Sequence, residues 1–190
     1  MKCPWITVCV YLLFTVCAQA QSAKPRAGIV PHHVKVQYAG SIGFISAGAG
    51  YEFGKKKKLQ GDLFYGYVPE SVGGVNIHSI TAKLTWLPVS KSLKNDLKLD
   101  LLTAGILVNY SFGRRYHLFS RTKYSFVYYG FPTAAHTAVF VGGAITKNKF
   151  GVYYEFGTTD RDLVSFASNP KAIGFFEIIN IGIGARISLR

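Results

Sequence analysis

The last seventeen residues of the chain, 174–190, constrain its fold more than any other stretch. They read GFFEIINIGIGARISLR, and taking every second residue separates two sets of side chains. One set is mostly large and aliphatic, with Ile181 and Ile183 at its centre, and the other is small or polar, with Gly182 and Gly184. A period of two puts the two sets on opposite faces of a β-strand, whereas glycines among isoleucines disfavour a helix. Soluble strands usually run about five or six residues. Alternation over about fifteen residues therefore predicts a tilted strand of a transmembrane barrel, with its aliphatic face toward lipid.

The end of this stretch carries a resemblance. Residues Gly184 to Leu189 resemble the C-terminal insertion signal of bacterial outer-membrane barrels, in which glycine is followed by two alternating hydrophobic residues. Members of that group usually end on an aromatic residue, whereas here Leu189 is followed by Arg190. The resemblance implies that the barrel-assembly machinery recognises this strand.

The first twenty residues predict export. The apolar run 5–17 is followed by Ala18-Gln19-Ala20, the form of a secretory signal peptide cleaved before Gln21. A lipoprotein signal using Cys17 is the alternative, although Val16 is bulky for the position before that cysteine. All three cysteines of the chain lie in this segment, so the exported chain is expected to hold no disulfide and no cysteine-based metal site.

Composition agrees with a membrane barrel. Hydrophobic residues make up 49% of the chain and aromatic residues 15%, yet no stretch after the signal approaches the ~20 apolar residues of a transmembrane helix. Hydrophobicity dispersed as alternation is typical of a transmembrane β-barrel. The formal net charge of +13 would ordinarily suggest nucleic acid as a partner. Export argues against nucleic acid and favours the phosphates of lipopolysaccharide as the counter-charge.

We divide the chain into a signal peptide at 1–20, a periplasmic leader at 21–32 and an outer-membrane barrel domain at 33–190. The predicted fold is all-β, an up-and-down antiparallel transmembrane barrel of eight strands. The strands are predicted at 34–38, 42–53, 59–68, 76–87, 98–112, 134–145, 149–158 and 174–190. The pattern leaves open whether 34–53 forms two strands or one long strand with a glycine-rich bend.

Loop length sets the predicted orientation, because bacterial barrels have short periplasmic turns and long external loops. The segments predicted in the periplasm are 54–58, 88–96, 147–148 and both termini, and those outside are 69–74, 113–132 and 159–173. Aromatic residues then form two groups, as interfacial girdles do. The external group is Tyr65, Tyr67, Tyr110, Phe112, Tyr154, Phe156 and Phe175, and the periplasmic group is Tyr51, Phe53 and Trp86.

Over nearly the whole exported part, this pattern resembles small outer-membrane β-barrels of the OmpX, OmpA-transmembrane and PagL type. That class includes adhesion or defence proteins, structural anchors and a few lipid A modifying enzymes, and the fold does not choose between them. PagL-type deacylases carry a His-x-Ser pair on one strand, with a following Asn and a later carboxylate. Here His78 directly precedes Ser79, so the two point to opposite faces, and the second place after His136 is not a serine. We therefore predict no catalytic residues and no enzyme, with Ser111 and His136 as the best candidates otherwise.

Five charged residues are predicted to point into the lumen, which in an eight-stranded barrel is only wide enough for side chains to fill. They are Glu52, Asp62, Lys83, Glu155 and Arg186. An unpaired buried charge costs several kcal/mol, so we expect ion pairs among them that close the pore. A narrow water or ion path is the alternative.

The sequence also suggests external contacts. The basic residues of the 113–132 loop are candidate contacts for anionic lipid, namely Arg114, Arg115, Arg121 and Lys123. His32 and His33 are adjacent and have no third ligand in view, so no metal or cofactor is predicted. The interpretation is a monomeric, non-enzymatic outer-membrane barrel with a structural or surface-interaction role, partnered by outer-membrane lipids and lipopolysaccharide. A deacylase-like enzyme, a narrow pore and a soluble lipocalin-like barrel, apolar inside and polar outside, are the alternatives.

Overall fold

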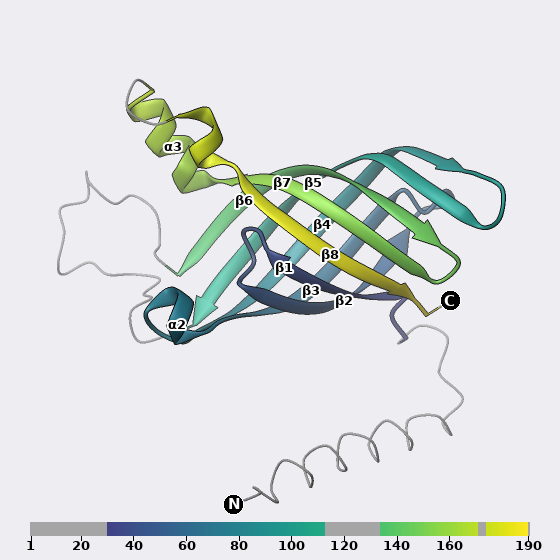
Figure 1. Cartoon of the computed structure of the whole chain (residues 1–190), viewed down its shortest axis with the longest axis horizontal. Helices are drawn as coiled ribbons and strands as arrows, with labels where there is room; N and C mark the ends of the chain where they lie inside the picture. Colours follow the sequence, from purple (N-terminus) through teal and green to yellow (C-terminus); the bar gives the residue numbers. More distant parts are fainter. Residues whose placement is uncertain (1–29, 113–133, 171–173, 190) are drawn as a thin grey trace, which may run out of the picture. The chain divides into compact units, whose positions relative to one another are not determined.

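The computed structural model describes residues 30–112, 134–170 and 174–189, and its strands form one closed barrel (Figure 1). Eight strands follow one another in chain order around the barrel, each antiparallel to its neighbours, and the last pairs with the first. They are β1 (His33–Ala39), β2 (Ile45–Phe53), β3 (Leu59–Val68), β4 (Ile77–Ser92), β5 (Leu97–Phe112), β6 (Ala135–Lys147), β7 (Phe150–Thr159) and β8 (Asn180–Ser188). The predicted all-β, up-and-down, eight-stranded architecture is confirmed.

The first two strands are separate, which answers the question that the sequence left open. Between them the chain reverses through the β1–β2 turn, residues 40–44. The reversal begins at Ala39, the last residue of β1, and Gly40, whose φ angles are 57° and 77°. The Ala39 backbone N–H donates to the Phe44 carbonyl at 2.9 Å and closes the turn. Glycine adopts a positive φ without steric cost, so Gly40 suits this reversal.

The predicted strand over 174–190 is wrong in its first third. Phe175–Ile178 form the 3-10 helix η1, and β8 begins only at Asn180. β1 ends at Ala39, which pairs with Gly182, so residues 174–179 of a longer β8 would have no partner on β1. In η1 Phe176 is 86% exposed and Ile178 is buried.

Helices occupy two segments that were predicted as loops. α2 (Glu70–Gly73) lies in the 69–74 loop and ends at Gly74, whose φ is 70°. α3 (Asp160–Ser168) begins directly after β7, and the Thr159 hydroxyl caps it by accepting from the Asp162 backbone N–H at 3.2 Å. A hydroxyl at the N-cap satisfies one of the free amides of the first turn.

The β4–β5 hairpin is longer than predicted. Residues 88–96 were expected to break the pattern, yet β4 continues to Ser92 and β5 resumes at Leu97. The register shifts between Trp86 and Val89, and such a bulge accommodates Pro88, which has no amide hydrogen to donate. The β6–β7 turn also shifts by one residue, to Asn148 and Lys149.

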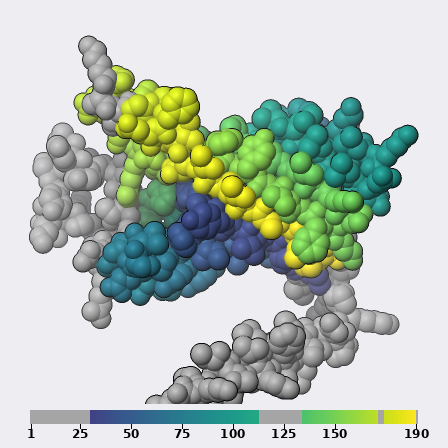
Figure 2. Space-filling model, in the orientation of Figure 1, coloured from purple at the N-terminus to yellow at the C-terminus, as the bar shows by residue number. Residues whose placement is uncertain are grey.

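Strand residues alternate between an outer wall and the lumen. Alternation along 98–112 and 174–190 predicts that Ile106, Ile181 and Ile183 face outward, and their exposed fractions are 56%, 54% and 56%. The same alternation places Leu102 and Val108 on the outward face with Ile106, and both are exposed. In Figure 2 the yellow segment of β8 crosses the visible wall obliquely, between β7 and β1, with which it pairs.

The barrel has two distinct ends. His33 at the start of β1 pairs with Ser188 at the end of β8, so the first and last strands begin and finish at the same end. We call this the terminus end; the turns 54–58, 93–96 and 148–149 lie there. The opposite end, the loop end, carries the β1–β2 turn, α2, α3 and η1, and Figure 1 shows the helices there and the β4–β5 hairpin at the far side. No helix among the described residues is long and apolar enough to cross a membrane.

Candidate functional site in the barrel lumen

Lys83 on β4 lies at the centre of the lumen. Its side chain is fully buried, and its Nζ donates to both carboxylate oxygens of Glu155 on β7, each at 2.5 Å. The same ammonium donates to Oε1 of Gln37 on β1 at 3.2 Å. These contacts join three strands that are not neighbours, so the ion pair crosses the lumen and ties opposite walls together.

Three aromatic rings surround the Lys83 ammonium. Its Nζ lies 4.5 Å from the ring centre of Phe140, 5.4 Å from that of Phe64 and 5.6 Å from that of Tyr153. A cation within about 6 Å of a ring face is attracted by the ring quadrupole, most strongly where water is excluded. The Tyr153 hydroxyl also donates to Gln37 Oε1 at 3.1 Å. We call the three rings of Phe64, Phe140 and Tyr153 the aromatic cage. The cage contacts the lysine on one side, while Glu155 neutralises its charge on the other.

Each cage ring lies over a glycine on the neighbouring strand. The cross-strand pairs are Gly48 with Phe64, Gly105 with Phe140 and Gly184 with Tyr153. A Cβ added at these glycines would come within 2.7, 2.3 and 2.3 Å of a ring atom, respectively. A narrow lumen accepts a large ring only where the opposite position has no side chain, so the glycines make room for the cage.

A second cluster forms around Asp62 on β3. One carboxylate oxygen lies 2.5 Å from Nε2 of His33, and the other accepts from the Lys35 ammonium at 2.7 Å. Lys35 also donates to Gln60 at 3.1 Å. Asp62 and both of its partners are buried, so this cluster cross-links β1 to β3 through the lumen.

A third pair lies nearer the terminus end. Arg186 on β8 donates to Oε1 of Glu52 on β2, and both side chains are largely buried, 13% and 10% exposed. Lys57, in the turn after β2, reaches the other oxygen of Glu52 at 3.4 Å with 65% of its side chain exposed. One carboxylate thus has a buried partner and a solvent-exposed partner.

The loop half of the lumen is filled differently. Ile42 in the β1–β2 turn is fully buried and packs with the apolar side chains Phe64, Leu107, Ala138 and Phe140. Its carbonyl accepts from the hydroxyls of Ser46 and Ser79, each at 3.1 Å. The turn therefore acts as a plug that is anchored by both apolar packing and hydrogen bonds.

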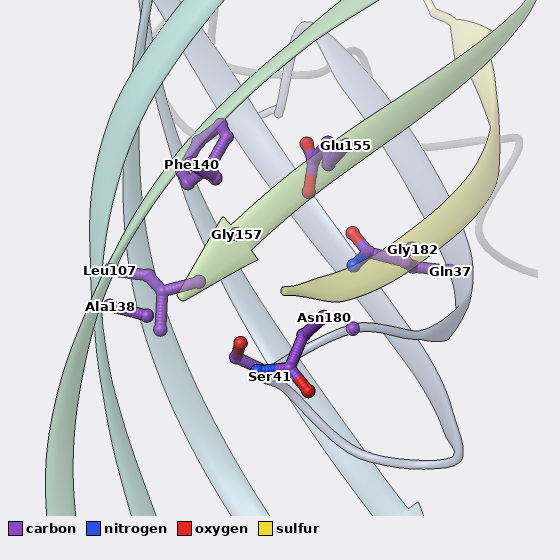
Figure 3. A pocket seen from close by; sticks show the side chains of 10 residues that line it. Gln37, Ser41, Leu107, Ala138, Phe140, Glu155, Gly157, Asn180 and Gly182 are labelled. Carbon is purple, nitrogen blue, oxygen red and sulfur yellow. The ribbon is translucent and has the colours of Figure 1, made fainter. Parts of the chain in front are cut away.

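A small cavity separates the plug from the Lys83–Glu155 pair. About 10 Å³ is open to the centre of a water molecule, which is room for roughly one water. Gln37, Asn180 and Glu155 line it, and Ser41 contributes a buried hydroxyl with no partner among the described residues (Figure 3). The cavity suits a single polar molecule of water size.

All five residues predicted for the lumen are placed there, but their partners are only partly those expected. The expected ion pairs occur for Lys83 with Glu155 and for Arg186 with Glu52. The partners of Asp62 are instead His33 and Lys35, which were not among the predicted residues. The alternation of Val34 and Val36 with Lys35 and Gln37 was the signal that places β1 side chains in the lumen.

The lumen is also less polar than predicted, because the cage rings and the plug form an apolar layer within it. Side chains alternate between the two faces of a strand, and Phe64 lies between the outward-facing Leu63 and Tyr65. The alternation could therefore have identified the Phe64 ring as pointing into the lumen. The candidate lipid contacts lie outside the described residues; they are Arg114, Arg115, Arg121 and Lys123.

The residues considered for hydrolase chemistry are not joined. His78 is exposed and Ser79 buried, so they face opposite sides of β4 as parity predicted, and Nδ1 of His78 lies 2.6 Å from the Tyr65 hydroxyl. Ser111 donates to Asn109 at 3.2 Å. The ring of His136 lies 3.2 Å from the Ser41 carbonyl. The lack of enzymatic activity stays a prediction.

Within the described ranges, no group of three or more His, Cys, Asp or Glu side chains is arranged to hold a metal ion. Comparison of the chain with protein-family models, with curated proteins and with solved structures finds no match. The fold and the lumen geometry therefore carry the functional argument by themselves.

Proposed function

We propose that this protein is a non-enzymatic outer-membrane β-barrel with a closed lumen and a structural or surface-interaction role in the cell envelope. The observation that carries the proposal is the inverted polarity of the barrel. Its outer wall is apolar and exposed, whereas charged side chains are buried and paired in its lumen.

The outer wall supports a lipid neighbour over a protein neighbour. Exposed Val, Leu, Ile and aromatic side chains occur on all eight strands rather than on one face. Apolar surface in water is unfavourable by about 25 cal/mol per Å², and soluble monomers rarely expose contiguous apolar patches above a few hundred Å². A protein partner would cover one sector, whereas lipid covers the whole circumference. A lipocalin-like barrel would have the opposite distribution.

The lumen supports a sealed barrel over a pore. From the terminus end to the loop end, the lumen is filled at successive levels by the Asp62 cluster, the Lys83–Glu155 pair and the plug around Ile42. An ion would have to displace paired charges or the apolar layer to pass, and both displacements are costly. The purified barrel is expected to give no stable conductance in planar bilayers, and a large, steady conductance would refute the sealed lumen.

Membrane insertion and orientation can be tested together. A membrane barrel should fractionate with the outer membrane and shift in gel mobility on boiling. The mature chain is predicted to lack cysteine, so single cysteines can be introduced at Ser71 near the loop end and at Asn95 near the terminus end. With the terminus end in the periplasm, an impermeant maleimide added to intact cells should label only the Ser71→Cys protein. Recovery in the soluble fraction would refute insertion, and labelling of Asn95→Cys alone would refute the orientation.

The non-enzymatic part of the proposal needs its own test. The folded barrel should leave lipid A unchanged when the products are examined by mass spectrometry. Loss of an acyl chain that Ser111→Ala or His136→Ala abolishes would show a deacylase.

A further inference from the structure

Exposed lysines gather at the terminus end of the barrel. We call them the lysine rim: Lys55, Lys56, Lys57, Lys58, Lys91, Lys94, Lys147 and Lys149. Among the described residues, the exposed carboxylate at this end is Asp96. At the loop end, the charged side chains of the described residues are mostly acidic. The acidic residues are Glu70, Asp160, Asp162 and Glu177, and the basic residue is Arg161.

Hydrogen bonds link the turns that carry the rim to the neighbouring strands and turns. The Leu87 backbone N–H donates to the Lys58 carbonyl at 2.8 Å and ties the β2–β3 turn to β4. The Asn148 backbone N–H donates to the Asp96 backbone carbonyl at 3.1 Å, and the Ser188 backbone N–H donates to the Lys149 backbone carbonyl at 2.7 Å. The lysines are therefore held on the perimeter of the barrel by backbone contacts.

Among the described residues, most of the rim lysines have no ion-pair partner. In the part of the chain that the structure describes, the ion pair of a rim lysine is that of Lys57 with Glu52. Lys58 donates to the Pro88 carbonyl at 3.2 Å, which is uncharged. A ring of like charges raises the potential around this end and attracts anions.

The rim also borders the apolar outer wall. Lys149 precedes Phe150, which is 66% exposed, and Lys58 precedes Leu59, which is 36% exposed. Trp86, near the same border, is 54% exposed. Lysine extends an aliphatic stem along apolar surface and places its ammonium at the polar boundary, and tryptophan favours the same boundary. An acidic protein would account for the charge but not for its position around this border.

We propose that the lysine rim binds the phosphate headgroups of anionic phospholipids in the leaflet that meets the terminus end. This inference rests on the proposed membrane insertion. The compact lysine ammonium acts as a point charge and needs no fixed geometry, which suits exchangeable headgroups. The rim then fixes the depth of the barrel by holding the terminus end at the headgroup layer.

The test uses the full barrel reconstituted in vesicles of phosphatidylcholine containing spin-labelled phosphatidylglycerol or spin-labelled phosphatidylcholine. The rim variant replaces Lys91, Lys94, Lys147 and Lys149 with glutamine. A variant with the same change in charge replaces Arg114, Arg115, Arg121 and Lys123 with glutamine. A third variant places arginine at the four rim positions.

The wild type and the arginine variant should prefer phosphatidylglycerol about threefold to tenfold at low salt, because each surface cation attracts anionic lipid. The preference should fall in 1 M salt, where the screening length shortens to about 3 Å. The rim glutamine variant should lose most of the preference, and the charge-matched variant should keep it.

The outcomes separate the two proposals. No preference in the inserted wild type, or a preference lost only in the charge-matched variant, would overturn the rim assignment and leave membrane insertion standing. Failure of the wild type to insert in neutral vesicles, judged by heat-modifiability, would overturn the proposed function, and the rim assignment with it. Heat-modifiability also shows whether each variant is folded.

Discussion

The outer and inner walls of the barrel use the same eight strands but constrain their side chains differently. On the outer wall Ile181 and Ile183 are each more than half exposed, so little of either side chain packs against protein. On the inner wall Lys83 is held by a carboxylate, an amide and three aromatic rings. The outer wall therefore depends on hydrophobicity, whereas the inner wall depends on the identity and register of each residue.

The contrast extends to the glycines. Gly184 and Ala185 are adjacent on β8, yet Gly184 lies under the Tyr153 ring and Ala185 faces outward and is exposed. One added methyl group therefore has different consequences at two consecutive positions. The comparison predicts that substitutions which keep hydrophobicity are tolerated outside, and that even small changes are costly inside.

The largest effect is expected where the lumen loses one charge of a buried pair. Glu155→Ala leaves Lys83 buried without its carboxylate, and the free energy of unfolding should fall by about 3–5 kcal/mol. Urea unfolding in lipid vesicles measures the loss. Lys83→Met combined with Glu155→Leu replaces the pair with apolar groups and should recover much of the stability. A loss below about 1 kcal/mol in the single variant would contradict the dependence on pairing.

A charge on the outer wall should be the next most damaging change. Ile181→Arg places a cation in the apolar wall of β8, and a cation near mid-membrane costs about 2–4 kcal/mol in transmembrane barrels, the class we propose for this protein. Ile181→Val keeps the hydrophobic character and serves as the control. The same unfolding measurement applies, and wild-type stability of the arginine variant in bilayers would argue against a lipid-facing wall.

Small additions of volume, one methyl group inside and two outside, should affect the inner and outer walls differently, on a smaller scale. Gly184→Ala puts a Cβ within 2.3 Å of the Tyr153 ring unless the ring moves, and such overpacking costs about 1–3 kcal/mol. Ala185→Val on the outer face should change stability by no more than about 0.5 kcal/mol. Equal effects of the two substitutions would remove the distinction between the walls.

Much of the fold could be predicted because alternation reports directly on which face a residue occupies. The unbroken pattern around Ile106 and Val108 identified β5 and its outward side correctly. The pattern failed at Phe175–Ile178, where four mostly apolar residues fit a strand by composition but form a 3-10 turn. Alternation describes the strand alone and carries no information about where the neighbouring strand ends, which for β1 is at Ala39, opposite Gly182.

The lumen could be predicted only in part for a similar reason. The alternation of side chains identified Asp62 and Lys83 as inward-facing, and the two residues are cross-strand partners in the β3–β4 register. Their side chains nevertheless pair elsewhere, Asp62 with β1 and Lys83 with β7. In a narrow closed barrel, side chains from distant strands meet across the lumen, and this closeness depends on closure and tilt rather than on neighbouring sequence.

The smallest effect is expected at Glu52, which has one solvent-exposed cation partner and one buried cation partner. Lys57 is 65% exposed and lies 3.4 Å from one oxygen, while Arg186, only 13% exposed, holds the other. Lys57→Ala should lower the free energy of unfolding by at most about 1 kcal/mol, because solvent and salt screen an exposed pair. The measurement belongs in neutral-lipid vesicles, so that removal of a rim charge does not also change lipid attraction, and the effect should vanish in 1 M salt. Arg186→Ala is the matched comparison at the same carboxylate and should cost more and depend less on salt. A larger loss for Lys57→Ala than for Arg186→Ala would mean that the exposed turn, rather than the lumen, stabilises Glu52.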